Sequence, residues 1–519
     1  MDTVSPESKV FEVTPEHEAI FESAQTGTSF AIVAGAGSGK TETSDQITRR
    51  EPEVPTLYLA FNRSVAREAL HRFASSVSVK TQHSLAYGAC GHHYKNRLSG
   101  SSPWTLRRAI EDRFTRAWQT AGGSADTARV ASFAAVATIV TFCQSADTAI
   151  DERHVPANAN LDATIVAHVS RALWKAIVDV NESLPVLHDI YLKLYQLSKP
   201  RIRAKRIIYD EGQDANPAML DIALSQDAQL IFIADPAQQI YAWRGAIDAL
   251  DAISLPRLPL SASWRFGHAI ANVANRILAV RRRDDGFRIV GRGGPSEVVE
   301  RSDKRPNVIL SRSNHGLVQR AVTYARDKTR IGLTKGPEML CEWLGAAYDL
   351  WKYGHSHHPA FSFFASWNDF QEVAQTQLGA IYRQFIELVA QYLNDTPEII
   401  RLLSNCCVDP ATADIILSTL HSYKGLEADD VELSDDYVPF CREDDTDDRV
   451  AQKFIYEQEE ANIAYVAMTR ARRTLILGSY ARVLDTSIAN VARMREAERS
   501  DAAAAVAAAE RLLETTDLD

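Results

Sequence analysis

The sequence predicts an α/β protein with two parallel sheets and two mostly helical insertions. Short apolar segments alternate with helical ones before residue 89 and again after residue 200, which is typical of a parallel sheet. A second alternating region begins near Leu258. Residues 89–200 show helical patterns without clear strands, and residues 330–410 are mostly helical and rich in aromatic side chains.

The first region begins with a helix expected within residues 11–29, because Thr14 is a good N-cap and Pro15 follows it in the first turn. A helix is also expected at residues 63–73. The strands predicted here are residues 30–33, 56–61, 77–81, 206–210 and 229–235. In the second region we predict strands at residues 308–311, 415–419 and 474–477, then a helix after Tyr480 that contains an alanine-rich run.

Composition excludes several classes of protein. The 519 residues are 45% apolar and 24% charged, which is ordinary for a globular protein. No apolar run approaches the length of a membrane span, and the start of the chain lacks the features of a secretory signal. The six cysteines show no CxxC spacing, so we expect a reducing compartment. A net charge of −10 excludes a basic coat but permits a locally basic nucleic-acid channel.

A glycine-rich loop, AGAGSGKT, runs from Ala34 to Thr41 directly after an apolar strand. Strand, glycine-rich turn and helix start form the context of a phosphate-binding loop, whose backbone N–H groups surround phosphate oxygens. In such a loop Lys40 places a positive charge at the β- and γ-phosphates, and Thr41 is a ligand for Mg²⁺. The alternative is a turn that binds nothing, which the GKT ending and the preceding strand disfavour.

Two of the predicted strands end in carboxylates, one in Asp210 and Glu211 and the other in Asp235. Open α/β sheets place their chemistry at this edge. In an enzyme with a phosphate-binding loop, the first carboxylate of the pair can hold Mg²⁺, and the second can orient or deprotonate the attacking water. Arg265 and Arg470, singled out by the segments around them, are candidates for stabilising charge on the γ-phosphoryl oxygens.

Eight segments occur in the order found in superfamily 1A helicases of the UvrD/Rep/PcrA type, which the chain resembles. They are the glycine-rich loop, AFNR at 60–63, TQHSLA at 81–86, YDEGQD at 209–214, ADPAQQIYAWRGA at 234–246, SASWRFG at 261–267, TLHSYKGLE at 419–427 and EEANIAYVAMTRA at 459–471. The segment HDIYLKLYQLSKP at 188–200 makes the F-box DNA helicase branch the most similar one, although no F-box is found. Ala34 is the residue expected at the start of a loop of this type.

The resemblance implies two RecA-like P-loop domains with ATP in the cleft between them. Domain 1A would comprise residues 1–88 and 201–256, and domain 2A residues 257–329 and 411–484. The helical insertions would be subdomain 1B, residues 89–200, and subdomain 2B, residues 330–410. A C-terminal helix and acidic tail would occupy residues 485–519.

The resemblance also implies roles at a site for ATP and Mg²⁺. The metal would be held by Thr41 and Asp210. Nucleotide-binding residues would be Gly35, Gly37, Ser38, Gly39, Lys40, Thr41, Trp264 beside the base and Glu427 on the ribose. Catalytic residues would be Lys40, Asp210, the base Glu211, the γ-phosphate sensor Gln238 and the arginine fingers Arg265 and Arg470.

The residues implied to contact nucleic acid are Phe61, Asn62, His83, Tyr241, Trp243, Arg244 and His421. Aromatic stacking on unpaired bases tolerates any sequence, which suits a motor that must step. The implied track is single-stranded DNA moved 3′ to 5′, with junctions between single and double strands as substrates. Because stacking reads every base alike, RNA stays open as a track.

Two functions stay open, and a third, a nucleotide-binding scaffold without turnover, is disfavoured because every hydrolytic residue is present. One is a stand-alone DNA helicase or translocase in repair or recombination. The other is a DNA-sensing ATPase subunit that activates a nuclease in an antiphage defence system, so a nuclease or a repair factor is a candidate protein partner. No membrane partner is expected. The expected location is the cytoplasm and nucleoid for a bacterial or phage protein and the nucleus for a eukaryotic one.

Three residues depart from the family pattern near the expected base. His17 stands where these helicases place a glutamine that reads adenine. Glu42 stands where many of them have arginine, and Trp264 replaces the usual stacking tyrosine. These departures concern adenine recognition and leave the hydrolytic residues in place.

Overall fold

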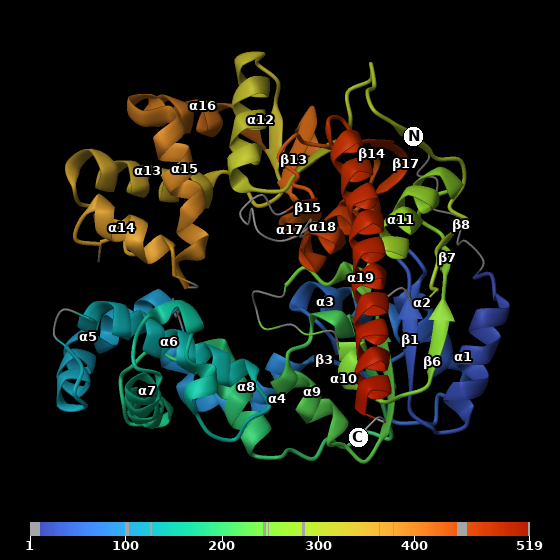
Figure 1. Ribbon diagram of the computed structural model, residues 1–519, viewed down its shortest axis with the longest axis horizontal. Helices are drawn as coiled ribbons and strands as arrows, with labels where there is room; N and C mark the ends of the chain where they lie inside the picture. The colour runs from blue at the N-terminus through green and yellow to red at the C-terminus, as the bar shows by residue number, and fades with distance from the viewer. Residues whose placement is uncertain are drawn as a thin grey trace.

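The computed structural model describes residues 11–98, 103–124, 127–241, 245, 247, 249–282, 286–362, 364–376, 378–443 and 454–516. These residues form two parallel sheets, and each sheet carries a group of helices inserted between its strands (Figure 1). The predicted α/β class is therefore confirmed. The described residues between 89 and 200 contain helices and no strand, as expected.

The first sheet has six parallel strands in the order β3-β2-β4-β5-β1-β6. The strands are β1 (Phe30–Ala34), β2 (Thr56–Ala60), β3 (Val77–Thr81), β4 (Arg206–Tyr209), β5 (Gln229–Ala234) and β6 (Arg257–Leu260). β1, β2, β4 and β5 are buried along their whole length, as expected of strands covered on both faces. The carboxyl ends of β1, β4 and β5 lead directly into the glycine-rich loop, Asp210 and Asp235.

The sixth strand moves the boundary expected at residue 256. β6 pairs in parallel with β1, with Val33 opposite Pro259 and Ala34 opposite Leu260. Proline lacks the N–H that a ladder needs, but an edge strand tolerates it. The first sheet therefore continues to Leu260, and the second region begins after that residue rather than near Leu258.

Helices surround the first sheet and build its insertion. Around the sheet lie α1 (Pro15–Gln25), α2 (Lys40–Arg50), α3 (Arg63–Arg72), α4 (Gln82–Ala89), α9 (Pro217–Leu224) and α10 (Ala249–Ala252). The first insertion contains α5 (Pro103–Thr120), α6 (Ala128–Gln144), α7 (Ala163–Val178) and α8 (His188–Leu197). α1 is shorter than the 11–29 expected, but its N-cap is Thr14 as predicted, in a capping box with His17.

The second sheet has seven parallel strands in the order β12-β11-β13-β10-β14-β17-β9. The strands are β9 (Glu297–Val299), β10 (Val308–Ser311), β11 (Ile331–Leu333), β12 (Cys407–Val408), β13 (Ile415–Thr419), β14 (Ala428–Leu433) and β17 (Ala471–Ile476). β11 and β12 lie inside the range expected for the second insertion, so that insertion is shorter than 330–410. Two small pairs complete the strands, β7 (Ala262–Ser263) with β8 (Val290–Gly291) and β15 (Cys441–Glu443) with β16 (Phe454–Tyr456).

The helices of the second half fall into two groups. Around the sheet lie α11 (His268–Val280), α12 (Asn314–Arg326), α17 (Leu420–Tyr423), α18 (Gln458–Met468) and α19 (Tyr480–Thr516). The second insertion contains α13 (Glu338–Tyr353), α14 (Trp367–Ala374), α15 (Arg383–Tyr392) and α16 (Thr396–Cys406). The long α19 crosses the front of the molecule in Figure 1 and starts at Tyr480, where the sequence predicts a helix with an alanine-rich run.

The first insertion has an apolar core of its own, and two of its side chains also pack into the core of the second insertion. Trp104 of α5 and Phe133 of α6 are buried in the same cluster as the aromatic side chains of the second insertion. The rings of Trp104 and Tyr382 lie 4.8 Å apart between centroids. Figure 1 shows the second insertion lying directly above the first. This contact brings parts of the chain far apart in sequence together on one side of the molecule.

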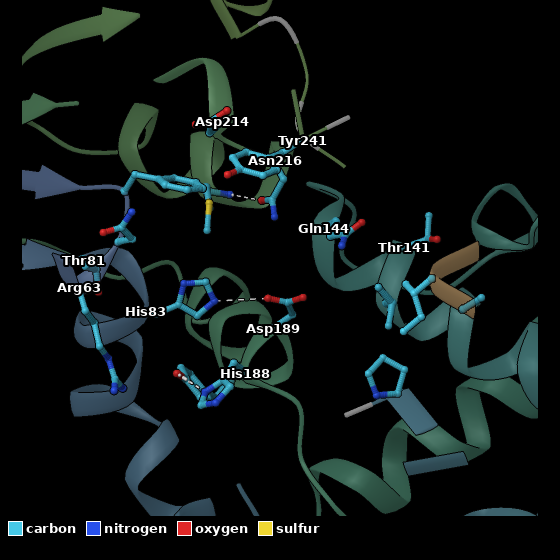
Figure 2. Close-up of a pocket in the computed structure, with 18 of the residues that line it drawn as sticks. Arg63, Thr81, His83, Thr141, Gln144, His188, Asp189, Asp214, Asn216 and Tyr241 are labelled. Atoms are coloured by element: carbon cyan, nitrogen blue, oxygen red, sulfur yellow. Dashed lines mark hydrogen bonds and ion pairs between the residues drawn. The ribbon is translucent and has the colours of Figure 1, made fainter. Parts of the chain in front are cut away.

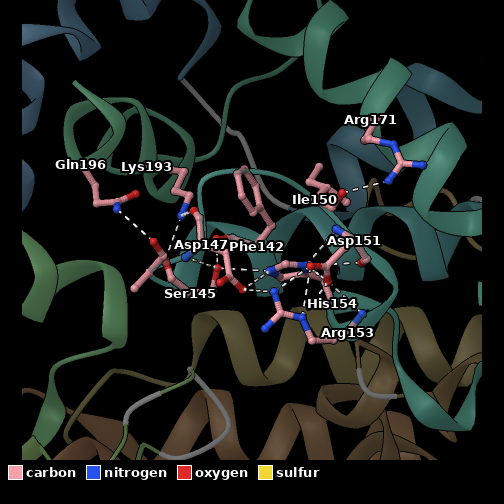
Figure 3. A network of polar contacts seen from close by, with 11 residues as sticks. Phe142, Ser145, Asp147, Ile150, Asp151, Arg153, His154, Arg171, Lys193 and Gln196 are labelled. Carbon is pink, nitrogen blue, oxygen red and sulfur yellow. Dashed lines mark hydrogen bonds and ion pairs between the residues drawn. The ribbon is translucent and has the colours of Figure 1, made fainter. Parts of the chain in front are cut away.

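A buried lysine holds the turn that follows α6 (Figure 3). The Lys193 ammonium donates to the carbonyl oxygens of Ser145 at 2.8 Å and Asp147 at 2.5 Å, and lies 4.3 Å from the centroid of the Phe142 ring. In the same turn the buried His154 ring contacts the Asp147 carboxylate at 3.1 Å. The cation thus satisfies backbone carbonyls beyond the helix end, where helices leave acceptors unpaired.

This burial makes the stability of the first insertion depend on pH. Burial lowers the pKa of Lys193 from 10.5 to about 8, although nearby acidic groups act in the opposite direction. Between pH 8 and 10.5 the unfolded chain therefore holds a proton that the folded chain has released. The free energy of unfolding rises with pH in that window by up to about 3 kcal/mol from this group.

We expect Lys193→Met to remove this rise. Chemical denaturation of wild type and variant at several pH values isolates it as their difference. Lys175→Met, which alters an exposed lysine on α7, is the matched control and should leave the pH dependence unchanged. If the difference in the free energy of unfolding between wild type and Lys193→Met stays constant from pH 8 to 10.5, the assignment to Lys193 is contradicted.

In the part of the chain that the structure describes, every helix is too short or too polar to cross a membrane.

Candidate nucleotide site and nucleic-acid groove

The glycine-rich loop follows β1 and ends at the start of α2. Gly37 and Gly39 have φ values of +73° and +79°, a backbone conformation that favours glycine. A Cβ added to Gly37 would lie 2.6 Å from the Cβ of Arg265 and 2.7 Å from the hydroxyl of Ser263. The Trp264 amide also donates to the Gly37 carbonyl at 2.9 Å. The loop therefore packs directly against the segment 261–267.

The predicted acidic residues gather around the ammonium of Lys40. Lys40 Nζ lies 2.8 Å from a Glu211 carboxylate oxygen, and the Gln213 amide donates to the other oxygen of that carboxylate. Asp210 is buried, with the Tyr58 hydroxyl donating to one of its oxygens. Glu211 adopts a left-handed backbone conformation with a φ of +53°, which costs on the order of 1 kcal/mol or more for a non-glycine residue.

The electrostatics follow from this crowding. Burial, reinforced by Glu211, raises the pKa of Asp210. Burial would also raise the pKa of Glu211, but the charges of Lys40 and Lys424 outweigh it and lower that pKa. Burial raises the pKa of Asp235. Burial alone would lower the pKa of Lys40, yet the surrounding carboxylates outweigh it and raise the pKa.

These residues fit a Mg²⁺ ion and a phosphate chain. Burial disfavours the charged forms of Asp210 and Asp235, and for Asp210 the neighbouring Glu211 charge adds to this; a divalent cation beside Asp210 and Thr41 would favour the ionised carboxylate. The described residues hold no group of three or more acidic, histidine or cysteine side chains placed to bind a metal. Mg²⁺ uses one or two carboxylates together with phosphates and water. Within the described chain, the buried Ser38 hydroxyl has no hydrogen-bond partner, so it is free to meet a phosphate oxygen.

The opposite wall of the cleft comes from the second half of the chain. Arg265 Nε lies 2.5 Å from a Glu427 carboxylate oxygen, so the predicted finger and the predicted ribose ligand contact each other. Arg470 is almost fully buried, and its Nε donates to the Val466 carbonyl at 2.9 Å. Burial, and then the charge of Arg265, lowers the pKa of Arg470.

A cleft cavity of about 550 Å³ separates these walls. The sequence-predicted residues that line it are Gly37, Ser38, Gly39, Lys40, Thr41, Asp210, Glu211, Gln238, Trp264, Arg265, Glu427 and Arg470. Gly35 is the one predicted nucleotide residue outside that lining. Its amide donates to the Leu260 carbonyl at 3.0 Å, which ties the loop to β6.

The three departures from the family pattern take different places. Trp264 and Glu42 both line the cleft cavity. His17 is fully buried and packs its ring 4.8 Å from the ring of Phe11. Its Nδ1 bonds to the Thr14 hydroxyl at 2.8 Å, so its resolved contacts are those of a helix cap.

A second, larger cavity of about 840 Å³ lies between the first sheet and the first insertion. We call it the groove. Its lining residues come from the ends of β2, β3 and β4 and from α5, α6 and α8, with Ile381 of the second insertion at its edge. Figure 2 shows His83 and Asp189 pointing toward each other across it, at 3.3 Å.

Four of the predicted nucleic-acid residues line the groove, namely Phe61, Asn62, His83 and Tyr241. The rings of Phe61 and Tyr241 are nearly parallel, 15° apart with centroids 6.1 Å apart. The His421 ring lies 6.1 Å from that of Tyr241, on a residue outside the described groove lining. Trp243 and Arg244 lie outside the described residues.

The structure adds residues that the sequence reasoning did not assign to a site. His188, Asp189 and Tyr191 line the groove, and they belong to the 188–200 segment used only as a family mark. Asp214 and Lys424, from segments 209–214 and 419–427, form a buried ion pair at 2.6 Å across the cleft. For all five residues, the sequence signal that could have pointed to a site was their position in segments typical of the family.

The cleft cavity and the groove share part of their walls. Phe61, Asn62, Asp214 and Tyr241 line both. Lys424 connects the two, because its ammonium bonds to Asp214 and to the Gln238 carbonyl at 2.9 Å and lies 4.8 Å from the centroid of the Tyr241 ring.

A cleft of this construction between two parallel sheets agrees with the comparisons to known proteins. The UvrD/REP helicase N-terminal domain matches residues 13–250, and the UvrD-like helicase C-terminal domain matches residues 363–482. Together these matches take in well over half of the chain, and the chain belongs to the UvrD-like helicase family.

Two curated relatives are similar over most of this chain. F-box DNA helicase 1 of Gallus gallus is 29% identical over 491 residues, covering 87% of this chain and 47% of the relative. F-box DNA helicase protein 1 of Schizosaccharomyces pombe is 28% identical over 518 residues, covering 90% and 57%. The chain thus spans about half the length of the curated relatives it matches. These similarities confirm the resemblance seen in the sequence.

Gly37 offers a test of the loop packing with a matched control. Gly27 has the same φ of +73° but open space around its Cβ position, whereas a Cβ on Gly37 meets Arg265 and Ser263. Both alanine variants should lose about 1 kcal/mol of stability to backbone strain. Only Gly37→Ala should also lower kcat/KM for the ATP hydrolysis that we propose below, by about 100-fold, because it displaces groups at the site. Steady-state kinetics and thermal unfolding separate the two effects, and equal kcat/KM values would contradict the prediction.

The ion pair of Lys424 with Asp214 gives a second test. Lys424→Met should destabilise the protein by about 3 kcal/mol, because the Asp214 carboxylate stays buried without its partner. Adding Asp214→Asn should recover most of that loss, while Lys335→Met at an exposed position should change little. Denaturant unfolding of wild type and the three variants measures the loss of stability and its recovery. If the double variant is less stable than Lys424→Met alone, the unpaired Asp214 carboxylate is not the cause of the lost stability.

Proposed function

We propose that this chain is the motor region of an ATP-dependent DNA helicase that moves 3′ to 5′ along single-stranded DNA and uses Mg²⁺. The proposal rests most on one observation, the sharing of walls between the cleft cavity and the groove. Asp214 and Tyr241 line both cavities, so they are the residues through which a change at the nucleotide can be passed to the groove. That is the arrangement by which hydrolysis can drive movement of a strand.

Each side chain at the cleft has a proposed task. Lys40 and the loop amides hold the phosphates, and Thr41 with Asp210 holds Mg²⁺, which would neutralise developing charge on the phosphates. Glu211 accepts a proton from the attacking water, for which its lowered pKa keeps it ionised. Arg265 and Arg470 stabilise charge on the transferred phosphoryl group from across the cleft. Hydrolysis then requires both walls together.

The groove is proposed to carry unpaired bases. Phe61 and Tyr241 offer nearly parallel aromatic faces, and stacking on such faces contributes about 1–3 kcal/mol per base. The names of the two relatives, both DNA helicases, favour DNA as the track. The direction 3′ to 5′ is taken from the family resemblance. Junctions of single and double strands, as met in repair and recombination, are the proposed substrates.

The proposed helicase activity should appear on a duplex with a 3′ single-stranded tail and not on one with a 5′ tail. ATP hydrolysis should rise when single-stranded DNA is added, and Lys40→Ala should lower it by about 100-fold or more, because the cation that meets the phosphates is lost. Strand displacement and phosphate release measured side by side give both quantities.

The outcomes separate the alternatives. DNA-stimulated hydrolysis without displacement on either tail would contradict a stand-alone helicase and favour an ATPase subunit that activates a partner nuclease. Hydrolysis at the level of Lys40→Ala in the wild type would contradict both. Displacement on a 5′ tail alone would overturn the proposed direction.

A further inference from the structure

One tyrosine of the second half of the chain reaches into the core of the nucleotide site. Tyr465 lies on α18, which packs within the core of the second sheet. The side chain is fully buried, yet its hydroxyl contacts two groups of the first half. Tyr465 lies in the segment 459–471 around Arg470, but the sequence alone gives no role for its side chain.

The hydroxyl makes one hydrogen bond in each direction. It accepts from the backbone N–H of Ala36, inside the glycine-rich loop, at 3.2 Å. It donates to Oδ2 of Asp235 at 3.1 Å. Burial raises the pKa of Tyr465 well above its ordinary value, so the hydroxyl keeps the proton that it donates.

The oxygen that receives this bond also holds Gln238. Gln238 Nε2 donates to the same Asp235 Oδ2 at 2.6 Å. The Asp235 amide in turn donates to the Gln213 side chain at 3.0 Å, and Gln213 donates to Glu211. One hydroxyl therefore stands at the end of a chain of hydrogen bonds that includes the γ-phosphate sensor and the proposed catalytic base.

We propose that Tyr465 is a positioning residue through which the second half of the chain sets Gln238, by way of Asp235, and the loop amide of Ala36. This inference rests on the proposed ATP hydrolysis. Ala36 and Asp235 follow strands of the first sheet, whereas Tyr465 lies on α18 beside the second, so the two bonds require the two halves to be docked. The hydroxyl thus adds to the arginine residues a further condition for a complete site.

Tyr465→Phe removes the hydroxyl and keeps the ring. We expect kcat for DNA-stimulated ATP hydrolysis to fall about tenfold, with KM for ATP changed less than threefold, because the sensor is misplaced while the phosphate-binding lysine stays. Tyr437→Phe is the matched control. Tyr437 is buried in the same core, and among the described residues its hydroxyl has no hydrogen-bond partner.

A second background separates positioning from partial unfolding. Adding Tyr465→Phe to Gln238→Ala should cost much less than tenfold, since the group it acts through is already gone. If Tyr465→Phe instead left a fraction of the protein inactive, kcat would fall by the same factor in the wild-type and the Gln238→Ala backgrounds. The proposal would be overturned if kcat of the double variant fell by the product of the two single-variant factors. It would also be overturned if Tyr465→Phe were as active as Tyr437→Phe.

A third readout does not depend on turnover. Hydrogen exchange of the backbone amide of Ala36 should be at least about tenfold faster in Tyr465→Phe than in wild type or Tyr437→Phe, because that amide loses its acceptor. Equal exchange in the three proteins would overturn the proposal even if hydrolysis were absent. Absence of hydrolysis in the wild type would contradict the proposed function while this measurement still decides the role of Tyr465.

Discussion

A buried imbalance of charge around the Lys40 ammonium is the constraint on which the rest of the cleft depends. Glu211 contacts the ammonium directly, and Asp210 and Asp235 are buried close enough to raise its pKa. One lysine cannot compensate several carboxylates in a site withdrawn from water. The second half of the chain adds the Lys424 ammonium, which pairs with Asp214 and helps to lower the pKa of Glu211. This ion pair joins the two halves of the chain beside the place where a phosphate chain would bind.

The same arrangement explains why the two cavities lie next to each other. The carboxyl ends of parallel strands meet at one edge of the first sheet, so the glycine-rich loop, Asp210 and Asp235 face the cleft. The residues just beyond those ends continue into the groove, where Tyr241 stands between the two. The insertions enclose the groove from the far side, joined by the packing of Trp104 on Tyr382. The proposed nucleotide site and the proposed strand-binding groove thus share Phe61, Asn62, Asp214 and Tyr241 in their walls.

Much of this was predictable because it is local in sequence. The places of the glycine-rich loop and of the strand-end carboxylates in the fold, and the inserted helices, depend on neighbouring residues and were predicted correctly. The edge strand β6 was missed because its pattern is short, half exposed and contains Pro259, and only its pairing with β1 reveals it. Trp104 and Tyr465 were missed for a related reason. Each looks like an ordinary apolar helix residue, and what it touches lies more than 200 residues away.

The central claim is that one site is completed by both halves of the chain while a strand occupies the groove. A structure with a transition-state analogue of ATP, Mg²⁺ and a single-stranded oligonucleotide tests it most directly. We predict Lys40, Arg265 and Arg470 all within about 3.5 Å of phosphate oxygens, and bases beside Phe61 and Tyr241. A nucleotide held by Lys40 alone, with Arg470 still bound to the Val466 carbonyl, or a strand outside the groove, would contradict the account.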